Sequence, residues 1–506
     1  MSFLSYRFLF FVLLLLLLYY TLLRRRQWQL LLVASALFYL ASGPGNLLFI
    51  AVTTISTYLS ARRIGRLHDL GNATKAQNTV SAVTQAVGVA QAAGATQAAG
   101  VARITLWLCL LVNFGMLAVC KVRVARGDML LPLGISFYMF SSMGYLMDVH
   151  RGSVKPEKSF FKTALFVSFF PQLIQGPIGR FDRLSAMYFT QHPYDARAVV
   201  FGLQRMLWGY FKKLVIADRI AVAVVSLLAP EHTGLSFLTL TCFYAVQLYA
   251  DFTGGIDIAL GVAEALGITL PENFARPFFS KNIAEYWRRW HMTLGEWMKD
   301  YIFYPVSVSA PMRRFGKYAR RRFKKAGRRL PVYAATLITW FCTGIWHGIT
   351  PNFLLWGMLN AGFIILSEEL TPLYKRFHAR FGLKDKKLYG CFEMLRMFFL
   401  MNLIRITDLF PSLPEYFRRL LTIFSSFRVP FGALGLSAAD YIVLALGCLL
   451  LILVSLCRER GIRLRAALWK RKSLGTLLTF ALLMLTIVLG RYGIGYDAAS
   501  FIYNRF

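Results

Sequence analysis

The sequence predicts an all-α polytopic membrane protein, and three observations support this class. The chain has 506 residues, 57% of them hydrophobic, and a mean hydropathy of +0.51. Its apolar residues form many stretches of the length that crosses a bilayer as a helix. Its cations, which give a formal net charge of +34, are concentrated in the short connections between those stretches. This distribution indicates membrane topology, so nucleic acid is not an expected partner.

The first apolar stretch is expected to be a retained membrane helix. It runs from Phe8 to Leu23, and three arginines follow it at 24–26. A cleaved signal would carry its charges before the apolar run and a small-residue cleavage site after it. By the positive-inside rule we expect the N-terminus outside and these arginines in the cytoplasm.

Further apolar runs follow, several of them interrupted. Gly43-Pro44-Gly45-Asn46 marks a turn inside the second run, which therefore predicts two helices. Pro and Gly also interrupt the runs at 131–134 and 170–177, where we expect broken or re-entrant helices whose freed backbone is covered by protein or a water-filled cavity. The runs lie at 28–60, 104–120, 129–147, 160–178, 199–229, 235–263, 332–346, 350–367, 390–406, 437–457 and 474–490.

The segment 71–102 differs from the rest in composition. It is rich in Ala, Gln and Gly, and near-copies of a six-residue unit begin at 85, 91 and 97. We expect a low-complexity cytoplasmic insert that forms a linker or a weak helix. The predicted organisation is N-terminal membrane helices at 1–70, this insert, a catalytic core at 103–370, and C-terminal membrane helices with an outer aromatic tail at 371–506.

Basic clusters bear on topology and partners. The basic stretch 458–472 is expected in the cytoplasm, so the last run crosses once more and the C-terminus lies outside. A denser cluster has two interpretations: a solvated loop on anionic lipid heads, or a docking site for an acidic acyl carrier protein or acyl-CoA phosphates. Its cations are Arg313, Arg314, Lys317, Arg320, Arg321, Arg322, Lys324, Lys325, Arg328 and Arg329.

Two histidines in apolar surroundings are the candidate catalytic residues. His291 lies in EYWRRWHMTLGEWMKDYIFY (285–304) and His347 in TGIWHG (343–348). Ionisable groups at membrane depth are costly, which makes them functional candidates. Histidine can act as the general base when an acyl group moves from a thioester to a hydroxyl. The alternative is that each is a hydrogen-bonded structural residue. The seven cysteines show no zinc or disulfide spacing, so no metal site is predicted.

Charged residues around His291 fall at helical intervals. Glu285, Arg288 and His291 are three apart, which predicts that they share one helix face. That face would either form surface ion pairs or line a tunnel mouth where Arg288 and Arg289 meet the phosphates of an acyl donor. Upstream, Asp251 and Asp257 lie in an apolar run and need a cavity or a partner. They could relay protons in a transporter, orient a histidine, or lock helices together.

Five segments carry a resemblance to a known family: 131–152, 166–180, 247–261, 270–306 and 346–357. Through these segments the chain resembles the membrane-bound O-acyltransferase superfamily, specifically the bacterial branch of alginate O-acetylation and teichoic acid D-alanylation. The resemblance implies a ring of tilted transmembrane and re-entrant helices around a central tunnel. It implies His347 as the principal catalytic residue and His291 as helper or donor-positioning residue. Further tunnel or donor-positioning candidates are Trp287, Arg288, Arg289, Trp290, Trp346, Asp251 and Asp257.

The chain end carries a second resemblance. The motif FIYNRF (501–506) resembles an aromatic C-terminal motif of this branch, which implies Tyr503 as an acyl relay. The family motif commonly has Phe and Gln where this chain has Asn504 and Arg505. A phenol with a pKa near 10 would need a base such as His347 to attack at neutral pH.

The predicted function is O-acylation of a cell-surface polysaccharide. A multi-pass protein of the bacterial cytoplasmic membrane would move an acyl group, preferably acetyl, outward from a cytoplasmic thioester. No cofactor is expected to stay bound, and acyl-CoA or an acyl carrier protein is the expected donor. Membrane lipid and an extracellular acyltransferase are the expected partners. D-alanyl transfer to teichoic acid is the alternative within the same class, and a transporter or flippase that uses Asp251 and Asp257 is the alternative outside it.

Overall fold

The computed structural model describes residues 1–80, 85–129, 131–173, 175–383, 386–492 and 501, and the side chains of these residues outside 71–95. Every regular element in this part of the chain is a helix, which confirms the predicted all-α class. Five of its helices are long and apolar enough to cross a membrane, so the chain is a multi-pass membrane protein. They are Thr96–Ala125, Leu235–Ala265, Pro351–Phe381, Ala438–Glu459 and Lys472–Leu489.

The chain packs as two compact units. The first comprises Met1–Val200 with Val262–Leu270, and the second comprises Phe201–Gly261 with Pro271–Phe506. The boundary at 200 falls inside the predicted core 103–370, whereas the division of the chain into four functional regions stays a prediction. The ring of helices around a tunnel also stays a prediction.

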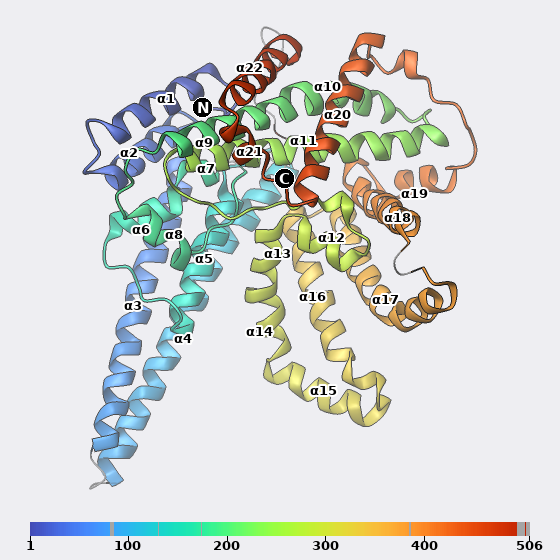
Figure 1. The fold of residues 1–506 in the computed structure, drawn as a ribbon. Coiled ribbons are helices and arrows are strands. Elements are labelled where there is room, and N and C mark those ends of the chain that lie inside the picture. Colours follow the sequence, from blue (N-terminus) through green and yellow to red (C-terminus); the bar gives the residue numbers. More distant parts are fainter. Residues whose placement is uncertain (81–84, 130, 174, 384–385, 493–500, 502–506) are drawn as a thin grey trace. The chain divides into compact units, whose positions relative to one another are not determined.

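The first unit confirms the predicted turn between two helices near the N-terminus. The turn at 43–46 separates α2 from α3, as its sequence predicts. Helices α3 and α4 run side by side as a long pair (Figure 1). They extend through the described part of segment 71–102, because Ala and Gln favour helix. The helices are α1 (Tyr6–Tyr20), α2 (Gln27–Leu40), α3 (Asn46–Val80), α4 (Gln85–Ala125), α5 (Ile135–Arg151), α6 (Phe160–Ser168), α7 (Phe170–Leu173) and α8 (Phe181–Tyr188).

The predicted interruptions in the first unit are also present. Gly134 precedes α5 with a φ of +68°, and a Cβ atom there would lie 2.2 Å from the carbonyl oxygen of Leu173. Only glycine allows this approach. The freed backbone is covered by protein, since the Tyr39 hydroxyl donates to the Leu133 carbonyl at 2.6 Å and Gln172 Nε2 donates to the Pro177 carbonyl at 2.8 Å.

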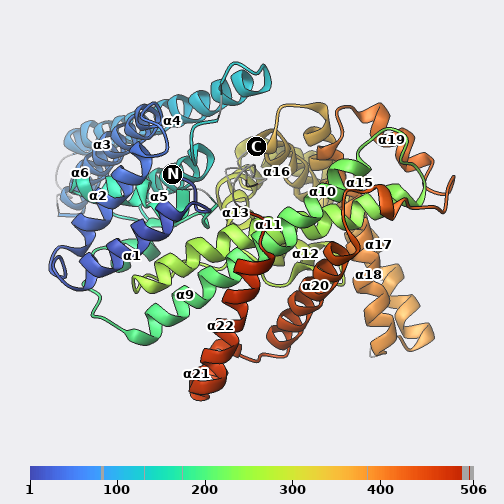
Figure 2. The ribbon, with the colours of Figure 1, turned by 90° about the horizontal axis from the view of Figure 1, so that it is seen from above.

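The second unit holds the candidate site. Its α16 and α17 form an antiparallel pair, with α15 near the lower end of α16 (Figure 1). Helices α20 and α22, which Figure 2 labels, both contact the π-helix η1 between α9 and α10. The elements are the end of α9 (Ala196–Tyr210), η1 (Phe211–Ala217), α10 (Asp218–Leu227), most of α11 (Leu235–Ala265), η2 (Pro277–Phe279), α12 (Ile283–Arg289), α13 (Met292–Met298), η3 (Lys299–Phe303), α14 (Tyr304–Ser307), α15 (Ala310–Phe323), η4 (Ala326–Arg328), α16 (Leu330–His347), α17 (Pro351–Phe381), α18 (Lys387–Arg405), η5 (Ile406–Leu409), α19 (Leu413–Leu421), η6 (Phe431–Ala433), α20 (Ala438–Glu459), α21 (Leu464–Lys470) and α22 (Lys472–Leu489).

Small residues bring α16 and α17 close together at the end that carries His347. A Cβ atom on Gly344 would lie 2.7 Å from the Phe353 carbonyl oxygen, and one on Gly357 would lie 2.5 Å from the Trp340 carbonyl oxygen. Close backbone approach at small residues is a common way to pack helices in membranes. The packing fixes the last turn of α16 against the first turns of α17.

Candidate active site

A cavity of about 600 Å³ in the second unit brings the two predicted histidines together. Its walls come from α12, α13, η3, α16 and α17, with one residue from the end of α18. Figure 1 shows these elements grouped in the yellow and orange part of the chain. The residues that line it are Ala284, Trp287, Arg288, Trp290, His291, Met292, Leu294, Gly295, Glu296, Met298, Lys299, Phe303, Thr336, Thr339, Trp340, Thr343, His347, Trp356, Ile364 and Arg405.

His347 is the last residue of α16 and is only 4% exposed. Its ring centre lies 4.6 Å from that of Trp356 at an interplanar angle of 73°, and 6.3 Å from the nearly parallel ring of Phe353. Gly348 permits this packing, because a Cβ atom there would meet the Phe353 ring at 2.1 Å. Aromatic rings therefore hold the imidazole in one orientation at the cavity wall.

A polar track on α16 leads to His347. Thr339, Thr343 and His347 follow one another at four-residue spacing and all line the cavity. The hydroxyl of Thr339 donates to the Ala335 carbonyl at 2.7 Å, and that of Thr343 donates to the Thr339 carbonyl at 2.8 Å. Sequence reasoning missed these threonines, although their spacing in an apolar run is visible in the sequence.

The prediction that Glu285, Arg288 and His291 share one helix face is wrong. Helix α12 ends at Arg289, and His291 has a φ of +46° as the residue that precedes α13. The turn is stabilised by Asn273, whose Oδ1 accepts from the Thr293 N–H at 3.1 Å and whose carbonyl accepts from the Met292 N–H at 2.9 Å. These contacts come from a segment outside the helix, so helical spacing could not reveal them.

The turn places His291 beside the amide of Asn273 and the ring of Phe252. Its Nδ1 lies 3.2 Å from Asn273 Oδ1, and its ring centre lies 5.0 Å from that of Phe252. The histidine is 3% exposed and lies outside the five membrane-spanning helices. Burial, assisted by the charge of Arg405, lowers the pKa of His291 to about 3. The ring is therefore neutral at physiological pH and available to handle a proton or orient a donor.

The predicted tryptophans surround the histidines. The centre of the Trp346 ring lies 6.3 Å from that of His291 and 4.6 Å from that of His347, but Trp346 is not among the described residues that line the cavity. Trp287 lines the cavity beside Trp356, at 5.9 Å between ring centres. Trp290 also lines the cavity. These rings give both imidazoles apolar neighbours, next to which electrostatic interactions are screened less than in water.

The two predicted arginines point to different places. Arg288 lines the cavity and is exposed. Arg289 pairs instead with Glu285 at 2.7 Å and with Glu459 at 3.0 Å, and it is absent from the described cavity wall. Among these two side chains, Arg288 alone is placed to meet a ligand in the cavity.

Asp251 and Asp257 do not line this cavity in the described part of the chain. Asp251 Oδ1 lies 2.6 Å from Lys213 Nζ. Asp257 lies 2.6 Å from Lys212 Nζ and 2.8 Å from Arg205 Nε. All five side chains are buried. Of the three roles weighed for the acids, this geometry favours a lock between α11 and the α9–η1 segment.

Arg405 is the cavity residue that the sequence interpretation overlooked. It ends α18, is 6% exposed and lines the cavity with both histidines. An arginine near the end of the apolar run 390–406 was the available signal, because embedded cations are functional candidates.

Tyr503, the predicted acyl relay, lies outside the described residues. Phe501, two residues earlier in the sequence, is buried, with its ring centre 4.8 Å from Lys213 Nζ.

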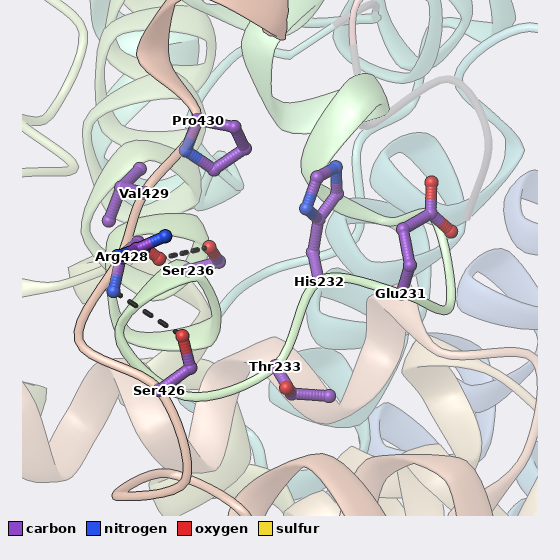
Figure 3. Close-up of a pocket in the computed structure, with 8 residues that line it drawn as sticks. All are labelled: Glu231, His232, Thr233, Ser236, Ser426, Arg428, Val429 and Pro430. Carbon is purple, nitrogen blue, oxygen red and sulfur yellow. Dashed lines mark hydrogen bonds between the residues drawn. The ribbon is translucent and has the colours of Figure 1, made fainter.

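A second pocket, of about 490 Å³, lies between the loop that follows α10 and the loop that precedes α20 (Figure 3). A hydrogen bond from the Ser236 hydroxyl to the Arg428 carbonyl at 3.2 Å ties the start of α11 to the loop that precedes α20. His232 and Glu231 are among its walls, but none of the predicted site residues is. The candidate active site is therefore the cavity of His291 and His347.

Among the described residues, no group of three or more His, Cys, Asp or Glu could hold a metal ion.

The fold and the cavity define the class: a multi-pass helical membrane protein with two buried histidines on one cavity. The chain belongs to the membrane-bound O-acyltransferase family, as predicted, because the family model described as "MBOAT, membrane-bound O-acyltransferase family" matches residues 155–407. The matched range contains both histidines and Arg405.

Named relatives are similar over part of their length. The chain is 31% identical to a "Probable alginate O-acetylase AlgI" of Pseudomonas syringae, over 51% of this chain and 48% of that protein. It is 31% identical to a "Peptidoglycan O-acetyltransferase" of Helicobacter pylori, over 53% of each. It is 30% identical to a "Teichoic acid D-alanyltransferase" of Bacillus subtilis, over 45% of this chain and 57% of that protein. The chain thus spans about half the length of the curated relatives it matches.

Proposed function

We propose that this protein is a membrane O-acyltransferase that transfers acetyl groups from a thioester for O-acylation of a cell-surface polysaccharide. The observation that carries the proposal is the placement of His291 and His347 on one buried cavity of a chain of this family. The names of the alginate and peptidoglycan relatives support acetyl transfer to polysaccharide.

In the proposed reaction the acceptor hydroxyl attacks the thioester carbonyl carbon. His347 takes the hydroxyl proton as general base and returns it to the departing sulfur as the C–S bond breaks. The neutral His291 ring, fixed by the Asn273 turn, positions the donor. The reaction needs no bound cofactor, since the donor carries its own leaving group.

The cavity edge fits a phosphate-bearing donor. Arg288 and Lys299 line it and are exposed, with Glu296 as the acid between them along the chain. Acyl-CoA and the phosphopantetheine arm of an acyl carrier protein both present phosphate to such cations. Either therefore serves as donor in this proposal.

The proposal places the protein in the bacterial cytoplasmic membrane with both termini outside and the basic connections on anionic lipid at the cytoplasmic face. An extracellular acyltransferase partner would complete transfer to the sugar, and Tyr503 would hold the acyl group as a relay. Fusing a reporter active on one side of the membrane to each terminus tests the orientation. A cytoplasmic signal from either terminus contradicts it.

The test of the function is chemical analysis of the polymer in source cells whose own copy has been replaced by variants. His347→Ala should abolish ester-linked acetate, released by mild alkali and identified by chromatography. His232→Ala, in the pocket of Figure 3, is the matched control and should keep wild-type acetate. Full acetylation in His347→Ala cells would overturn the proposal. Release of D-alanine in place of acetate would identify the teichoic acid reaction of the third relative instead.

A further inference from the structure

Arg405 presents a buried positive charge to the reaction cavity. Among the described residues that line the cavity, the charged ones are Arg288, Glu296, Lys299 and Arg405. The first three are exposed, whereas Arg405 is 6% exposed. A buried cation acts through a lower effective dielectric than an exposed one, so its effect on a nearby reaction is stronger.

The guanidinium is held from behind by an acid that the cavity does not reach. Arg405 Nη2 lies 3.2 Å from Asp408 Oδ2, and the Asp408 side chain is 1% exposed. Asp408 in turn accepts a hydrogen bond from the Tyr244 hydroxyl at 3.1 Å. Neither Asp408 nor Tyr244 is among the described cavity-lining residues. The ion pair is thus oriented with its positive end toward the cavity.

The same guanidinium is linked to the catalytic histidine through one tryptophan. Its central carbon lies 5.3 Å from the centre of the Trp356 ring, a distance typical of a cation–π contact. Trp356 also contacts His347, at 4.6 Å between ring centres. The cation and the imidazole therefore pack on one rigid, buried indole.

The segment that follows Arg405, η5 with Phe410, is also fixed to the helix that carries Trp356. Asn352 Nδ2 donates to the carbonyl oxygens of Thr407 at 3.0 Å and Phe410 at 2.6 Å. Asn352 lies in the first turn of α17, one turn before Trp356. Fixed donors that need no reorganisation are what stabilises charge in a transition state.

We propose that Arg405 is a catalytic residue whose guanidinium stabilises the oxyanion on the thioester carbonyl and thereby favours an uncharged acyl group over an aminoacyl group. This inference rests on the proposed function. As the acceptor oxygen bonds to the carbonyl carbon, the C=O π pair moves onto the carbonyl oxygen, where the guanidinium N–H groups meet it. When the pair returns, the C–S bond breaks and the sulfur receives the proton from His347.

The selectivity follows from the same charge. A D-alanyl group carries an ammonium one carbon away from the carbonyl, so a guanidinium on the carbonyl oxygen would face a like charge in a site of low dielectric. An acetyl group carries no such charge. The names of the relatives give two acyl groups, acetyl and D-alanyl. Of these two, the Arg405 cation favours acetyl as the group that this protein transfers.

The test measures thiol release by membranes that contain each variant, with acetyl and D-alanyl thioesters offered on both CoA and an acyl carrier protein. Arg405→Gln should lower kcat for acetyl transfer by about 10²–10³-fold, as loss of an oxyanion donor does, with little change in KM. Arg405→Lys should recover part of that rate. Relative to acetyl, transfer of D-alanyl should rise in Arg405→Gln. Arg396→Gln, on the same helix and against Tyr374, is the control and should behave as wild type.

Structural damage is separated from catalysis by two readouts. The first readout is folding, measured by the melting temperature and the amount of each variant in the membrane. The second is Asp408→Asn, which keeps the Arg405 cation but weakens the ion pair that orients it. The loss of kcat in Asp408→Asn should therefore be smaller than that in Arg405→Gln. Equal losses in Arg405→Lys and Arg405→Gln, or an unchanged acyl preference, would overturn the inference. If His347→Ala is inactive while both Arg405 variants retain their rate, the inference fails and the proposed function stands. Activity in His347→Ala overturns the proposed function itself.

Discussion

The second unit buries charge in two regions that look alike in the sequence and differ in the structure. In the α9–η1–α11 region, Arg205, Lys212 and Lys213 meet Asp251 and Asp257 at ion-pair distances of 2.6 to 2.8 Å. In the active-site cavity, the two histidines are enclosed by aromatic rings, and the buried cation among the described wall residues faces the cavity. Charges enclosed by one another hold helices together, whereas imidazoles set against rings, and a cation that pairs with Asp408 on one side and faces the cavity on the other, can act on a substrate.

The largest expected effect comes from the histidine pair. His347→Ala should lower the rate of acyl transfer by about 10²–10⁴-fold, the usual range for loss of a general base. His291→Ala should cost less, because His291 positions the donor. The effects of groups that act as one unit on the rate are not additive. The double variant His291→Ala with His347→Ala should therefore be only slightly slower than His347→Ala. Rate constants in membranes measure this, and strictly multiplicative losses would show that the two rings act independently.

Substitutions in the α9–η1–α11 region should change the stability of the fold and leave the rate of acyl transfer unchanged. Asp257→Asn leaves Lys212 and Arg205 without their full partner and should reduce the free energy of unfolding by about 3–5 kcal/mol, as broken buried ion pairs do. The double variant Lys212→Met with Asp257→Leu should recover part of that stability, because it removes both charges of the Lys212–Asp257 pair while Arg205 keeps its ion pair with Glu272 at 2.7 Å. Melting temperatures in detergent, with acyl transfer per folded molecule, test this. Loss of function with unchanged melting would instead favour a coupling acid in a transporter.

Acidification should destabilise the cavity through His291. The pKa of this residue is 6.5 when free and about 3 in the folded chain, so between these values the unfolded chain binds a proton that the folded chain excludes. Stability contributed by the neutral ring is complete above pH 6.5 and declines as the pH falls toward 3. The melting temperature of wild type should fall more steeply than that of His291→Gln over this window. Parallel curves would show that the folded ring titrates normally.

The smallest effect is expected on the basic helix α15, where Met312, Gly316 and Ala319 are buried and the cations are exposed. Each cation near an anionic membrane surface contributes about 1 kcal/mol. Replacing Arg313 and Arg320 with Gln should reduce the anionic lipid that copurifies with the protein and leave kcat unchanged. A raised KM for the thioester, with lipid content unchanged, would favour the docking of a phosphate-bearing donor on this helix.

The sequence predicts the features that depend on local pattern. Apolar run length predicts the membrane helices, and Gly and Pro mark the turn at 43–46 and the break before α5. The histidines are recognisable because an imidazole in an apolar run is rare. These properties depend on residues that are close together in the chain.

Features set by distant contacts could not be predicted in this way. The turn at His291 depends on Asn273, 18 residues away, and the pairing of Asp251 depends on Lys213, 38 residues away. Arg289 turns from the cavity because Glu459 lies beside it, 170 residues later. Arg405 lines the cavity where Asn352 of α17 holds η5, which directly follows Arg405 in the chain. Spacing along one helix carries no record of these partners.

The most direct test of the account is a structure of the protein with a non-hydrolysable acetyl thioether analogue of the donor. We predict that the analogue binds in the cavity, with the carbon that replaces the carbonyl, and the sulfur bonded to it, next to His347. His291 and Arg405 should lie within contact distance of these atoms. The phosphate of the analogue should lie near Arg288 or Lys299. Binding of the analogue in the pocket of Figure 3, or a cavity closed to it from both faces of the membrane, would contradict the account.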